Sequence, residues 1–259
     1  MNVQVLKLGG ELIEATEART AMASRIASLV SQGPLIVIHG GGKAIDAELA
    51  RRGIAPKKVD GLRITDAETL DAVVAVIAGT TNTALVASLV SAGVRAVGLT
   101  GVDAGCGRAT RVAPITSTAG EVVSLGLVGD PTSADPALFR TLVSAGYVPV
   151  VACIGIDDAG QVLNVNADVI ACRIAAAVQA TALIIAGTTA GVFNAAGHTI
   201  AELDTDGMDA LITSGAANAG MVAKLHACRT ALDAGVAAVK IVHGQDLTTG
   251  TTLVAGVRA

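Results

Sequence analysis

The stretches VQVLKLGGELI (residues 3–13) and PLIVIHGGGKAID (residues 34–46) share one pattern: an apolar run stops at consecutive glycines and resumes with helical spacing. The apolar runs predict buried strands, and the segments that follow predict helices. A strand that ends at glycines and opens a helix presents free backbone N–H groups, which bind anions, and glycine lets a phosphate come close to the chain. The two turns therefore predict an α/β fold with an anion site, although glycines also end strands for packing reasons.

The same alternation continues along the chain. Six apolar runs that stop at glycine or polar turns predict strands, at 3–8, 34–38, 94–99, 148–153, 182–186 and 237–242. Stretches with helical spacing lie at 17–31, 42–52, 66–78, 81–92, 136–145, 167–180 and 220–234. This order of elements predicts βαβ units, and hence a three-layer αβα sandwich around a central, mostly parallel sheet.

One segment breaks the alternation. Residues 105–128 have the pattern of short strands with a turn at Thr118–Gly120, which predicts a β-hairpin inserted on the edge of the sheet. No Pro- or Ser-rich linker divides the 259 residues, so we expect a single domain over 1–259. If the domain has two lobes, an N-lobe over 1–175 and a C-lobe over 176–259 share the one sheet.

The composition limits the kinds of function. The chain has no Trp, one Tyr and two Phe, so its core must be built from close-packed Ala, Val, Ile and Leu, as in a parallel sheet buried on both faces. A net charge of −4 gives no basic surface for nucleic acid, and bases would find few aromatic rings on which to stack. Four scattered cysteines without a CxxC motif indicate buried thiols in a reducing compartment, and no metal-binding motif stands out.

Two long runs without charge, Ala72–Val94 and Ile174–Gly197, raise the question of a membrane span, which needs ~20 apolar residues. GTTNT (79–83) interrupts the first run, and Gln179 with GTT (187–189) interrupts the second. Each run is therefore predicted to divide into two elements of a soluble protein. The chain does not begin with a basic region followed by an apolar stretch, so no signal peptide is predicted. We expect a cytoplasmic protein with no membrane partner.

Three charged residues stand at the ends of apolar elements. Lys7 is the penultimate residue of the first apolar run, where it either reaches solvent at the sheet edge or points into a cleft beside the glycines. Asp168, in NVNAD (164–168), either caps the next helix or lies in its first turn, where the helix dipole favours a carboxylate. Lys224, in AGMVAKL (219–225), is one turn inside a helix and faces either phosphates or solvent.

Further polar side chains lie in two short motifs. Arg63, in GLRITD (61–66), is a natural bidentate partner for a carboxylate, although surface ion pairs are the commoner use of arginine. Asn164 and Asn166 alternate on a strand-like segment, so we expect both to face the same side. His39 is the histidine closest to a glycine turn, where we expect it to make a structural hydrogen bond.

The glycine turns match neither of the common nucleotide motifs. Gly42-Lys43 is followed by Ala44, and Val37 stands where a P-loop has its first glycine, so the Walker A pattern fails at both ends. GxGxxG is absent from both turns. Ser, Cys and His do not cluster as a nucleophile with its base. Two lysines, two glycine turns, an arginine, an asparagine and a carboxylate suit phosphoryl transfer, in which the protein mainly positions groups and neutralises charge.

Six motifs appear in the order found in one family: KLGG (7–10), VIHGGG (37–42), GLRITD (61–66), NVNAD (164–168), LIIAGTTAGVF (183–193) and GMVAKL (220–225). From residue 4 to the closing GTTLV (250–254), the chain resembles the amino-acid kinases, and it is most similar to the acetylglutamate kinases of arginine biosynthesis. GLRITD and NVNAD are specific to that branch, whereas KLGG and the triple glycine occur across the superfamily. The resemblance implies the amino-acid kinase fold, with the acyl amino acid bound by the N-lobe and the nucleotide by the C-lobe.

The resemblance also implies a reaction. The γ-phosphoryl group of ATP would pass to the side-chain carboxylate of N-acetyl-L-glutamate and give an acyl phosphate. Lys7 and Lys224 would neutralise that group from opposite sides, and Asp168 would hold both lysines. Arg63 and Asn164 would bind the α-carboxylate of the acceptor. Mg²⁺ would bridge the ATP phosphates, which supply most of its oxygen ligands.

The same resemblance assigns roles to the glycines. The amides of Gly9, Gly10, Gly41 and Gly42 would contact the phosphate and the attacking carboxylate, with Gly41 and Gly42 on the acceptor side. The implied nucleotide-binding positions are Gly9, Gly10, Gly187, Thr188, Gly191, Gly220 and Lys224. The family usually has a Ser/Thr-Asp pair where this chain has Gly187-Thr188, so the carboxylate expected near the ribose is missing.

Three functions stay open at this point. The first is phosphorylation of N-acetyl-L-glutamate, and the second is phosphorylation of another acylated acidic amino acid, such as an aminoadipate. The third is a regulatory or binding protein on the same fold, but a protein that only binds has no need to keep Lys7, Lys224 and Asp168 together. The first strand begins at residue 2 or 3, which leaves no room for the N-terminal helix that arginine-inhibited members use to form hexamers. We therefore expect a homodimer without arginine feedback.

Overall fold

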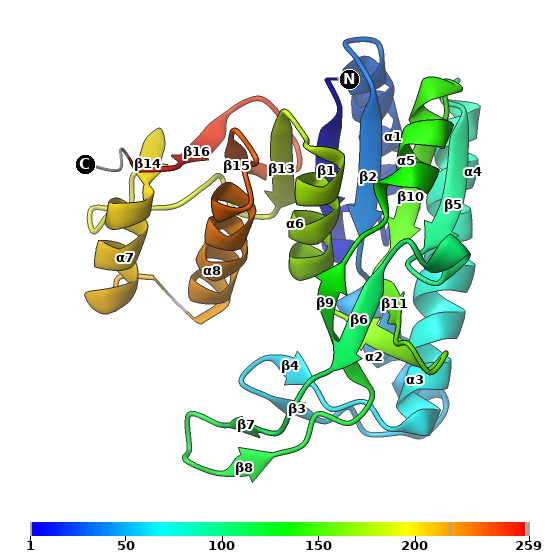
Figure 1. The fold of residues 1–259 in the computed structure, drawn as a ribbon, viewed down its shortest axis with the longest axis vertical. Helices are drawn as coiled ribbons and strands as arrows, with labels where there is room; N and C mark the ends of the chain where they lie inside the picture. The colour runs from blue at the N-terminus through cyan, green and yellow to red at the C-terminus, as the bar shows by residue number, and fades with distance from the viewer. Residues whose placement is uncertain (1, 218, 257–259) are drawn as a thin grey trace.

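An eight-stranded sheet forms the centre of the computed structural model, which describes residues 2–217 and 219–256 (Figure 1). Its strands lie in the order β14-β16-β15-β13-β1-β2-β10-β5. Their bounds are Gln4–Leu8 for β1, Leu35–His39 for β2, Ala96–Thr100 for β5, Val148–Ala152 for β10, Ala182–Gly187 for β13, Glu202–Asp204 for β14, Val239–His243 for β15 and Gly250–Val254 for β16. Neighbouring strands pair in parallel, except β15 with β16. The six predicted strands and the mostly parallel α/β class are confirmed.

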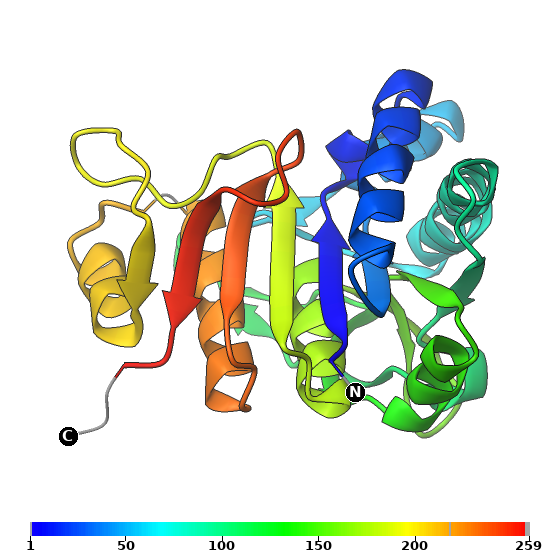
Figure 2. The ribbon, with the colours of Figure 1, turned by 90° about the horizontal axis from the view of Figure 1, so that it is seen from above.

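Helices cover both faces of this sheet and complete the three layers (Figure 2). One face carries α1 (Thr16–Val30) and α4 (Asn82–Ser91), and the other carries α5 (Pro136–Ser144), α6 (Ala167–Val178) and α8 (Ala219–Asp233). Two further contacts complete this arrangement: α7 (Thr205–Thr213) packs beside α8, and α2 (Gly42–Arg51) packs against α3 (Ala67–Val74). Each predicted helical stretch corresponds to one of these helices. The unpredicted helix is α7.

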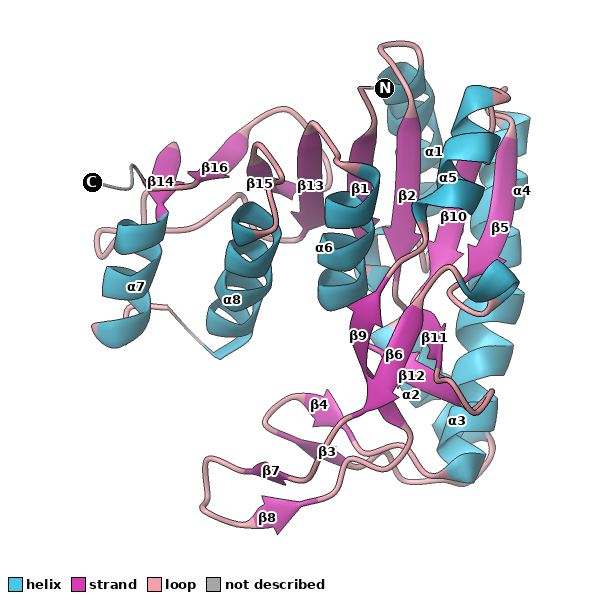
Figure 3. Ribbon diagram, in the orientation of Figure 1, coloured by secondary structure: helices cyan, strands magenta, loops and turns pink. Residues whose placement is uncertain are grey.

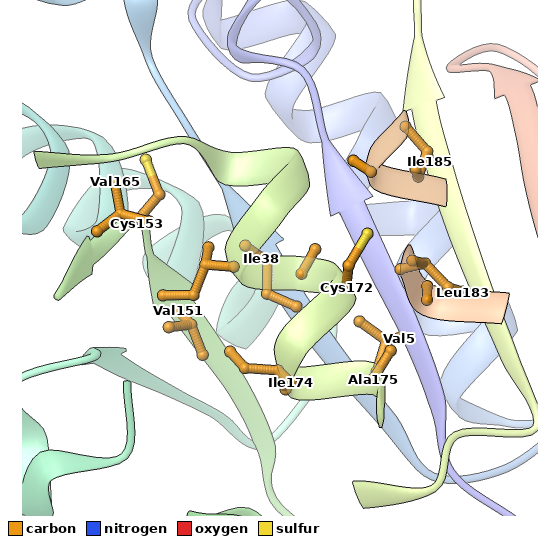
Figure 4. Packing of buried hydrophobic residues seen from close by; sticks show 14 of the residues in the cluster. Val5, Ile38, Val151, Cys153, Val165, Cys172, Ile174, Ala175, Leu183 and Ile185 are labelled. Carbon is orange, nitrogen blue, oxygen red and sulfur yellow. The ribbon is translucent and has the colours of Figure 1, made fainter. Parts of the chain in front are cut away.

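The alternation of side chains along β1 decides which layer each residue meets. Val5 faces α6, whereas Leu6 and Leu8 face α1 and α4. Figure 4 shows the hydrophobic cluster on the α6 side of the sheet, in which Ala175 and its neighbours in α6 lie against Val5 and the adjoining strands. Lys7 is two residues after Val5 and therefore points to the same side as α6. The core is made of small and branched aliphatic side chains, as the composition predicts.

A small four-stranded barrel continues from the carboxyl ends of the central strands (Figure 3). It consists of β6 (Arg108–Arg111), β9 (Val128–Ser133), β11 (Ile154–Ile156) and β12 (Val162–Val165). Two short hairpins lie beyond it, β3 (Lys58–Val59) with β4 (Leu62–Arg63) and β7 (Ile115–Thr116) with β8 (Val122–Val123). Residues of β4 and β12 line one pocket together with the glycine turn that follows β2.

The predicted hairpin exists, but its predicted place was wrong. β7 and β8 enclose the turn at Thr118–Gly120, where Gly120 has a φ of 83°. The flanking strands β6 and β9 bond to each other and to β11 and β12 instead of extending the central sheet. The hairpin therefore extends from the barrel, and β5 is the edge strand of the sheet. Short alternating strands carry no information about which sheet they join.

The first charge-free run was also predicted wrongly. Residues Ala67–Ser91 form one continuous helical run, in which a π-helical stretch (Ala75–Thr81) joins α3 to α4. The polar break GTTNT is absorbed because the helix widens there instead of ending. By length and composition this run could cross a membrane, and 33% of its most apolar window is buried inside the protein. Its buried side chains pack in both core layers.

The second run does divide as predicted. α6 ends at Val178, Gln179 takes a left-handed conformation with a φ of 56°, and β13 begins at Ala182. The short elements that were not predicted include β14, α7 and β16. β14 has three residues, α7 carries a glycine in its first turn, and β16 has glycine and two threonines, so each gives a weak signal in the sequence.

Candidate active site

The two glycine turns lie side by side at the ends of β1 and β2. These strands pair in parallel with Leu8 opposite His39, so Gly9-Gly10 and Gly40-Gly41 leave the sheet together. A Cβ on Gly10 would lie 3.0 Å from the Cα of Gly41, which shows how closely the two turns approach. After the first turn comes the 3₁₀ turn η1 (Gly10–Leu12), and α2 begins at Gly42. Both turns therefore lie together at the carboxyl ends of β1 and β2.

The amides of these glycines differ in their availability. Gly9 N–H donates to the carbonyl of Ala186 at 2.9 Å, so this amide is not free to contact a phosphate as the resemblance implied. In the described part of the chain, Gly10, Gly41 and Gly42 have no backbone partner for their N–H groups. Gly41 and Gly42 also lie at the N-terminus of α2, where the helix dipole favours an anion.

Asp168 joins the two predicted lysines. Lys7 Nζ lies 2.9 Å from Asp168 Oδ1, and Lys224 Nζ lies 3.0 Å from Asp168 Oδ2. Lys7 is 8% exposed, although β1 is otherwise apolar. Of the two alternatives for Lys7, the structure shows the inward one, since the side chain is buried and its ammonium group meets Asp168 on α6. Two ammonium groups thus share one carboxylate.

The electrostatic balance keeps this carboxylate ionised. Burial alone would raise the pKa of Asp168, but the charges and hydrogen bonds of Lys7 and Lys224 outweigh burial and hold the pKa below its usual value. One negative and two positive charges leave the cluster with a net positive charge. Such a cluster attracts an anion and stabilises the negative charge of a phosphoryl group.

The sequence NVNAD explains how α6 presents Asp168. Asn166 is the N-cap, and its Oδ1 accepts hydrogen bonds from the amides of Asp168 and Val169 at 2.8 and 3.3 Å. Asp168 is therefore in the first turn of α6, and the capping role belongs to Asn166. Asn164 is on β12 and donates from Nδ2 to Thr65 Oγ1 at 3.1 Å. Both asparagines line the same pocket, as their alternation predicts.

That pocket, here called the acceptor pocket, has a volume of about 260 Å³. Four predicted substrate-binding residues line it, namely Gly41, Gly42, Arg63 and Asn164. Arg63 Nη2 donates to the carbonyl of Gly42 at 3.1 Å. Arg63 Nη1 is buried and has no hydrogen-bond partner among the described residues. A buried guanidinium nitrogen without a partner suits a carboxylate ligand.

Asp46 and Lys58 belong to this pocket region and were missed from the sequence. Asp46 Oδ1 lies 2.6 Å from Arg63 Nη2, and Lys58 Nζ donates to Asp46 Oδ2 at 2.7 Å. Partial burial would raise the pKa of Asp46, but its hydrogen bonds with Lys58 and Arg63 lower the pKa overall. Asp46 is on α2 and Lys58 on β3, in two segments that no motif links, so only the fold brings them together.

A second pocket, here called the nucleotide pocket, includes Lys224 in its lining. Its volume is about 340 Å³, and it is lined by Gly220 and Lys224 together with Thr189, Val192, Phe193 and Met221. Phe193 is 44% exposed, and this mostly apolar lining suits the flat face of a base. Val192, Phe193 and Met221 were missed because apolar residues in a loop or helix ordinarily serve packing, and Thr189 was missed because a single threonine in a loop gives no specific signal.

The other predicted nucleotide-binding residues do not line this pocket; they are Gly9, Gly10, Gly187, Thr188 and Gly191. Gly187 ends β13 and accepts a hydrogen bond from the amide of Gly244, and Thr188 follows it in the loop. Gly191 has a φ of 136°, and a Cβ there would lie 2.6 Å from Thr251 Oγ1, so close packing requires this glycine. Close packing therefore explains the glycine at position 191 without any ligand.

Glu11 is a further charged residue at the turns. A Cβ on Gly9 would lie 2.3 Å from Glu11 Oε1, and a Cβ on Gly187 would lie 3.7 Å from the same atom. The carboxylate of Glu11 thus lies between the first glycine turn and the end of β13. The described residues include no group of three or more His, Cys, Asp or Glu side chains arranged to hold a metal ion.

Comparisons with known proteins agree with this geometry. A family model described as "Amino acid kinase family" matches residues 2–243. A relative named acetylglutamate kinase, from Symbiobacterium thermophilum, is 41% identical over 247 residues, which cover 93% of this chain and 84% of that protein. Another of the same name, from Solibacter usitatus, is 40% identical and covers 93% and 90%. The crystal structure of smu.665 from Streptococcus mutans UA159 is similar with a TM-score of 0.83, at 26% identity over 98% of both chains.

Proposed function

The chain belongs to the amino acid kinase family, and on that premise we propose that it transfers the γ-phosphoryl group of ATP to the side-chain carboxylate of N-acetyl-L-glutamate. The product is an acyl phosphate of the kind used in arginine biosynthesis. Relatives named acetylglutamate kinase at 35–41% identity support this acceptor. The observation that carries the proposal is the position of Asp168, which pairs with both Lys7 and Lys224. Asp168 directly follows Ala167, which lines the acceptor pocket, and its partner Lys224 lines the nucleotide pocket.

The acceptor pocket binds the acylated amino acid. Arg63, held by Asp46 and the carbonyl of Gly42, offers its free Nη1 to the α-carboxylate. Asn164 lies beside it and offers amide groups to the same ligand. The side-chain carboxylate then points toward Gly41 and Gly42, whose amides are free in the described chain. An acceptor bound in this way is oriented for attack before the nucleotide reacts.

Transfer then needs little help from acid or base. A carboxylate oxygen of the acceptor forms the new O–P bond, while the bond between the γ-phosphorus and its bridging oxygen breaks and leaves ADP with the electron pair. The attacking carboxylate is already ionised at neutral pH, so no general base is required. Lys7 and Lys224 neutralise the oxygens of the moving group from two sides. Asp168 stays ionised and keeps the lysines in position.

The nucleotide pocket holds the base of ATP between apolar side chains, and Lys224 reaches the phosphates from the same side. A bound Mg²⁺ would supply further positive charge beside the phosphate groups of the nucleotide. Glu11 is the carboxylate closest to Gly9 and Gly187, and we propose that it faces this metal or its water shell. Thr188 stands where the family usually has the Asp near the ribose, so that carboxylate is missing here. The nucleotide preference of this chain is therefore set by the residues that line its nucleotide pocket.

Hydroxylamine trapping tests the reaction directly. We would incubate the protein with N-acetyl-L-glutamate, Mg²⁺ and a panel of nucleoside triphosphates, and measure the hydroxamate formed from the acyl phosphate. Hydroxamate with ATP supports the proposal, and hydroxamate only with another nucleotide identifies Gly187-Thr188 as the change that sets nucleotide preference. N-acetylaminoadipate in the same assay tests the second acceptor. Absence of product from folded protein that still binds N-acetyl-L-glutamate by calorimetry would leave only the binding function.

We also propose that the protein is a cytoplasmic homodimer. The four cysteines are free and buried, which supports a reducing compartment. β5 is the edge strand of the sheet, and a groove between β5 and the helical run that precedes it is lined by Ala78, Thr83, Val86, Ala87 and Leu99. A second copy that packs helix on helix across this groove would cover both the open edge and the apolar side chains.

A further inference from the structure

His39 is a buried polar residue that the proposed reaction does not use. It is the last residue of β2, directly before the second glycine turn, and none of its surface is exposed. Its ring contacts one group on each side. Nδ1 lies 3.1 Å from the carbonyl oxygen of Gly40, and Nε2 lies 3.1 Å from Nδ2 of Asn82. Buried polar groups that have all their hydrogen-bond partners fix the local geometry, so these two contacts hold the His39 ring in one orientation.

The partners determine where the imidazole carries its proton. The carbonyl of Gly40 can only accept a hydrogen bond, so Nδ1 must donate to it. Asn82 Nδ2 can only donate, so Nε2 must accept. The amide of Asn82 is oriented by its other neighbours, because Nδ2 also lies 2.9 Å from the carbonyl of Val150 and 3.4 Å from that of Leu99. His39 is therefore neutral, with its hydrogen on Nδ1.

Burial supports the neutral form. Desolvation lowers the pKa of His39 to about 4, although the hydrogen bond with Gly40 opposes that shift. The ring thus has one donor and one acceptor throughout the neutral pH range. The donor at Nδ1 pairs with the carbonyl of Gly40, and the acceptor at Nε2 pairs with Asn82 Nδ2.

Asn82 anchors the ring to the rest of the sheet. Its contacts with Val150 on β10 and Leu99 on β5 join two strands that lie beyond β2. Gly98 leaves room for it, because a Cβ at Gly98 would lie 2.3 Å from Asn82 Oδ1. Asn82 itself is 4% exposed and is the first residue of α4. The position of the His39 ring is therefore set from β5, β10 and α4 together.

The hydrogen bond from His39 determines the direction of the next amide. The peptide bond between Gly40 and Gly41 is trans, so its carbonyl and its N–H point in opposite directions. The carbonyl turns inward to His39, so the N–H of Gly41 turns outward, to the side of Gly10 and the acceptor pocket. Glycines on both sides of this peptide would otherwise let it rotate freely.

We infer that His39 is a positioning residue: through the carbonyl of Gly40 it directs the N–H of Gly41 at the reacting oxygens, where the attacking carboxylate meets the transferring phosphoryl group. This inference rests on the proposed function. Loss of the donor at Nδ1 frees the peptide, so the amide is no longer oriented before the reaction. The effect belongs to the transition state and therefore to kcat, since acceptor and nucleotide keep their other contacts.

Two substitutions separate the two halves of the ring. In His39→Asn the amide nitrogen takes the place of Nδ1 and can still donate to Gly40, but the contact with Asn82 is lost. In His39→Gln the amide reaches the place of Nε2 and keeps Asn82, but no donor remains for Gly40. Asn is also the smaller side chain in a fully buried position, so it leaves the larger cavity and should unfold at the lower temperature.

We expect kcat of His39→Gln to be at least about tenfold below that of His39→Asn, with KM values for both substrates within about threefold of each other. The order of activity is then opposite to the order of thermal stability. A merely structural role predicts that kcat follows stability, with His39→Asn the weaker enzyme. That result, or equal kcat values, would overturn the inference.

A measurement on the unmodified protein keeps the test decisive if a variant does not fold. ¹⁵N-detected imidazole spectra, assigned by elimination with substitutions at His198, His226 and His243, report the tautomer of His39. We expect the neutral Nδ1–H form, and the Nε2–H form would overturn the inference because it cannot donate to Gly40. Unmodified protein that traps no hydroxamate contradicts the proposed function instead, and the spectrum still tests the contact.

Discussion

Single side chains decide the chemistry of this site, and Lys7 is the one whose surroundings differ most from those of an ordinary lysine. A lysine on a buried strand costs stability unless a counter-charge meets it, and Asp168 supplies that charge at 2.9 Å. Lys240 offers a comparison. It is on β15 between Val239 and Ile241, which face the α6 layer, so Lys240 faces the opposite layer.

Lys7→Ala should lower kcat by at least about a hundredfold, because one of two charges that neutralise the transferring group is lost. Lys240→Ala removes a strand lysine on the other face and should leave kcat within about threefold of the original value. Steady-state trapping of hydroxamate measures both. A near-normal turnover of Lys7→Ala would show that the lysine serves only the folded structure.

The acceptor side gives a second prediction at this scale. Asp46→Asn removes the negative charge that holds Arg63 and Lys58, so the guanidinium loses its fixed orientation. We expect KM for N-acetyl-L-glutamate to rise by about tenfold, with a much smaller change in KM for ATP. Asp71→Asn is the matched control, because Asp71 pairs with Arg52 on the same part of the surface and is 74% exposed. Equal effects on both KM values would place the contribution of Asp46 outside the acceptor pocket.

At the scale of elements, the approach of the two glycine turns is the feature on which the site depends. A methyl group on Gly10 would meet the backbone of Gly41 at 3.0 Å, and that backbone cannot move without shifting the start of α2. A methyl group on Gly42 would meet nothing within 4 Å. The same chemical change therefore has two different outcomes on facing turns.

Gly10→Ala should destabilise the protein by roughly 1–3 kcal/mol, the usual cost of forcing extra volume into a packed contact. Gly42→Ala should have no such cost and gains helix propensity of up to about 1 kcal/mol at the start of α2. Urea unfolding of the two variants measures the difference. Equal stabilities would mean that the turns separate easily and do not form one rigid anion site.

The elements also show what a sequence can and cannot predict. Strands such as 182–186 were predictable because a short, unbroken apolar run between polar turns is typical of a strand buried on both faces. The helical run through GTTNT was predicted to break, since propensity penalises glycine and threonine, but packing against both layers keeps the helix and widens it. Lys7, Asp168 and Lys224 were found through motifs with fixed spacing, whereas Asp46 and Lys58 were missed because their partnership exists only after β3 and β4 fold over α2.

For the whole molecule, the order of the strands explains why the site lies where it does. β1 is central, with β2, β10 and β5 on one side and β13, β15, β16 and β14 on the other (Figure 1). The acceptor pocket is formed mainly by the first group with the barrel, and the nucleotide pocket is formed by segments after β13. α6 carries Asp168 and contacts both β1 and α8. The proposed division into lobes near residue 175 falls within this helix.

The stability of the whole molecule should depend on pH through His39. Its pKa is about 4 in the folded protein and 6.5 in an unfolded chain, so between these pH values the unfolded state binds more protons. The stabilisation is complete above pH 6.5 and is lost as the pH falls toward 4, by about 2 kcal/mol at pH 5. Asp46 and Asp168 also have lowered pKa values in the folded protein, but the stabilisation that they contribute is lost at lower pH, as the pH falls below their usual 3.8.

Urea unfolding at pH 7 and pH 5 measures this loss, and His39→Gln is the control because it has no ionisable group at this position. The unmodified protein should lose about 2 kcal/mol more than the variant over this interval. An equal loss in both proteins would show that the imidazole is not shielded from solvent, contrary to its burial.

The proposed homodimer gives the last prediction at the scale of the assembly. Thr83, Val86 and Ala87 line the groove beside β5, and Val90 continues the same face of α4, three to four residues further on. Val90 is 55% exposed and Val122 is 75% exposed. Val122 is on β8, in the hairpin that lies far from α4 (Figure 3). Val90→Asp adds a charge that an apolar interface cannot accommodate, whereas Val122→Asp makes the same change elsewhere.

Light scattering with size-exclusion chromatography should give a dimer for the unmodified protein and for Val122→Asp, and a monomer or a dimer at least about tenfold weaker for Val90→Asp. A dimer that Val90→Asp leaves intact would place the interface on another face of the molecule, and a monomeric unmodified protein would refute the proposed assembly.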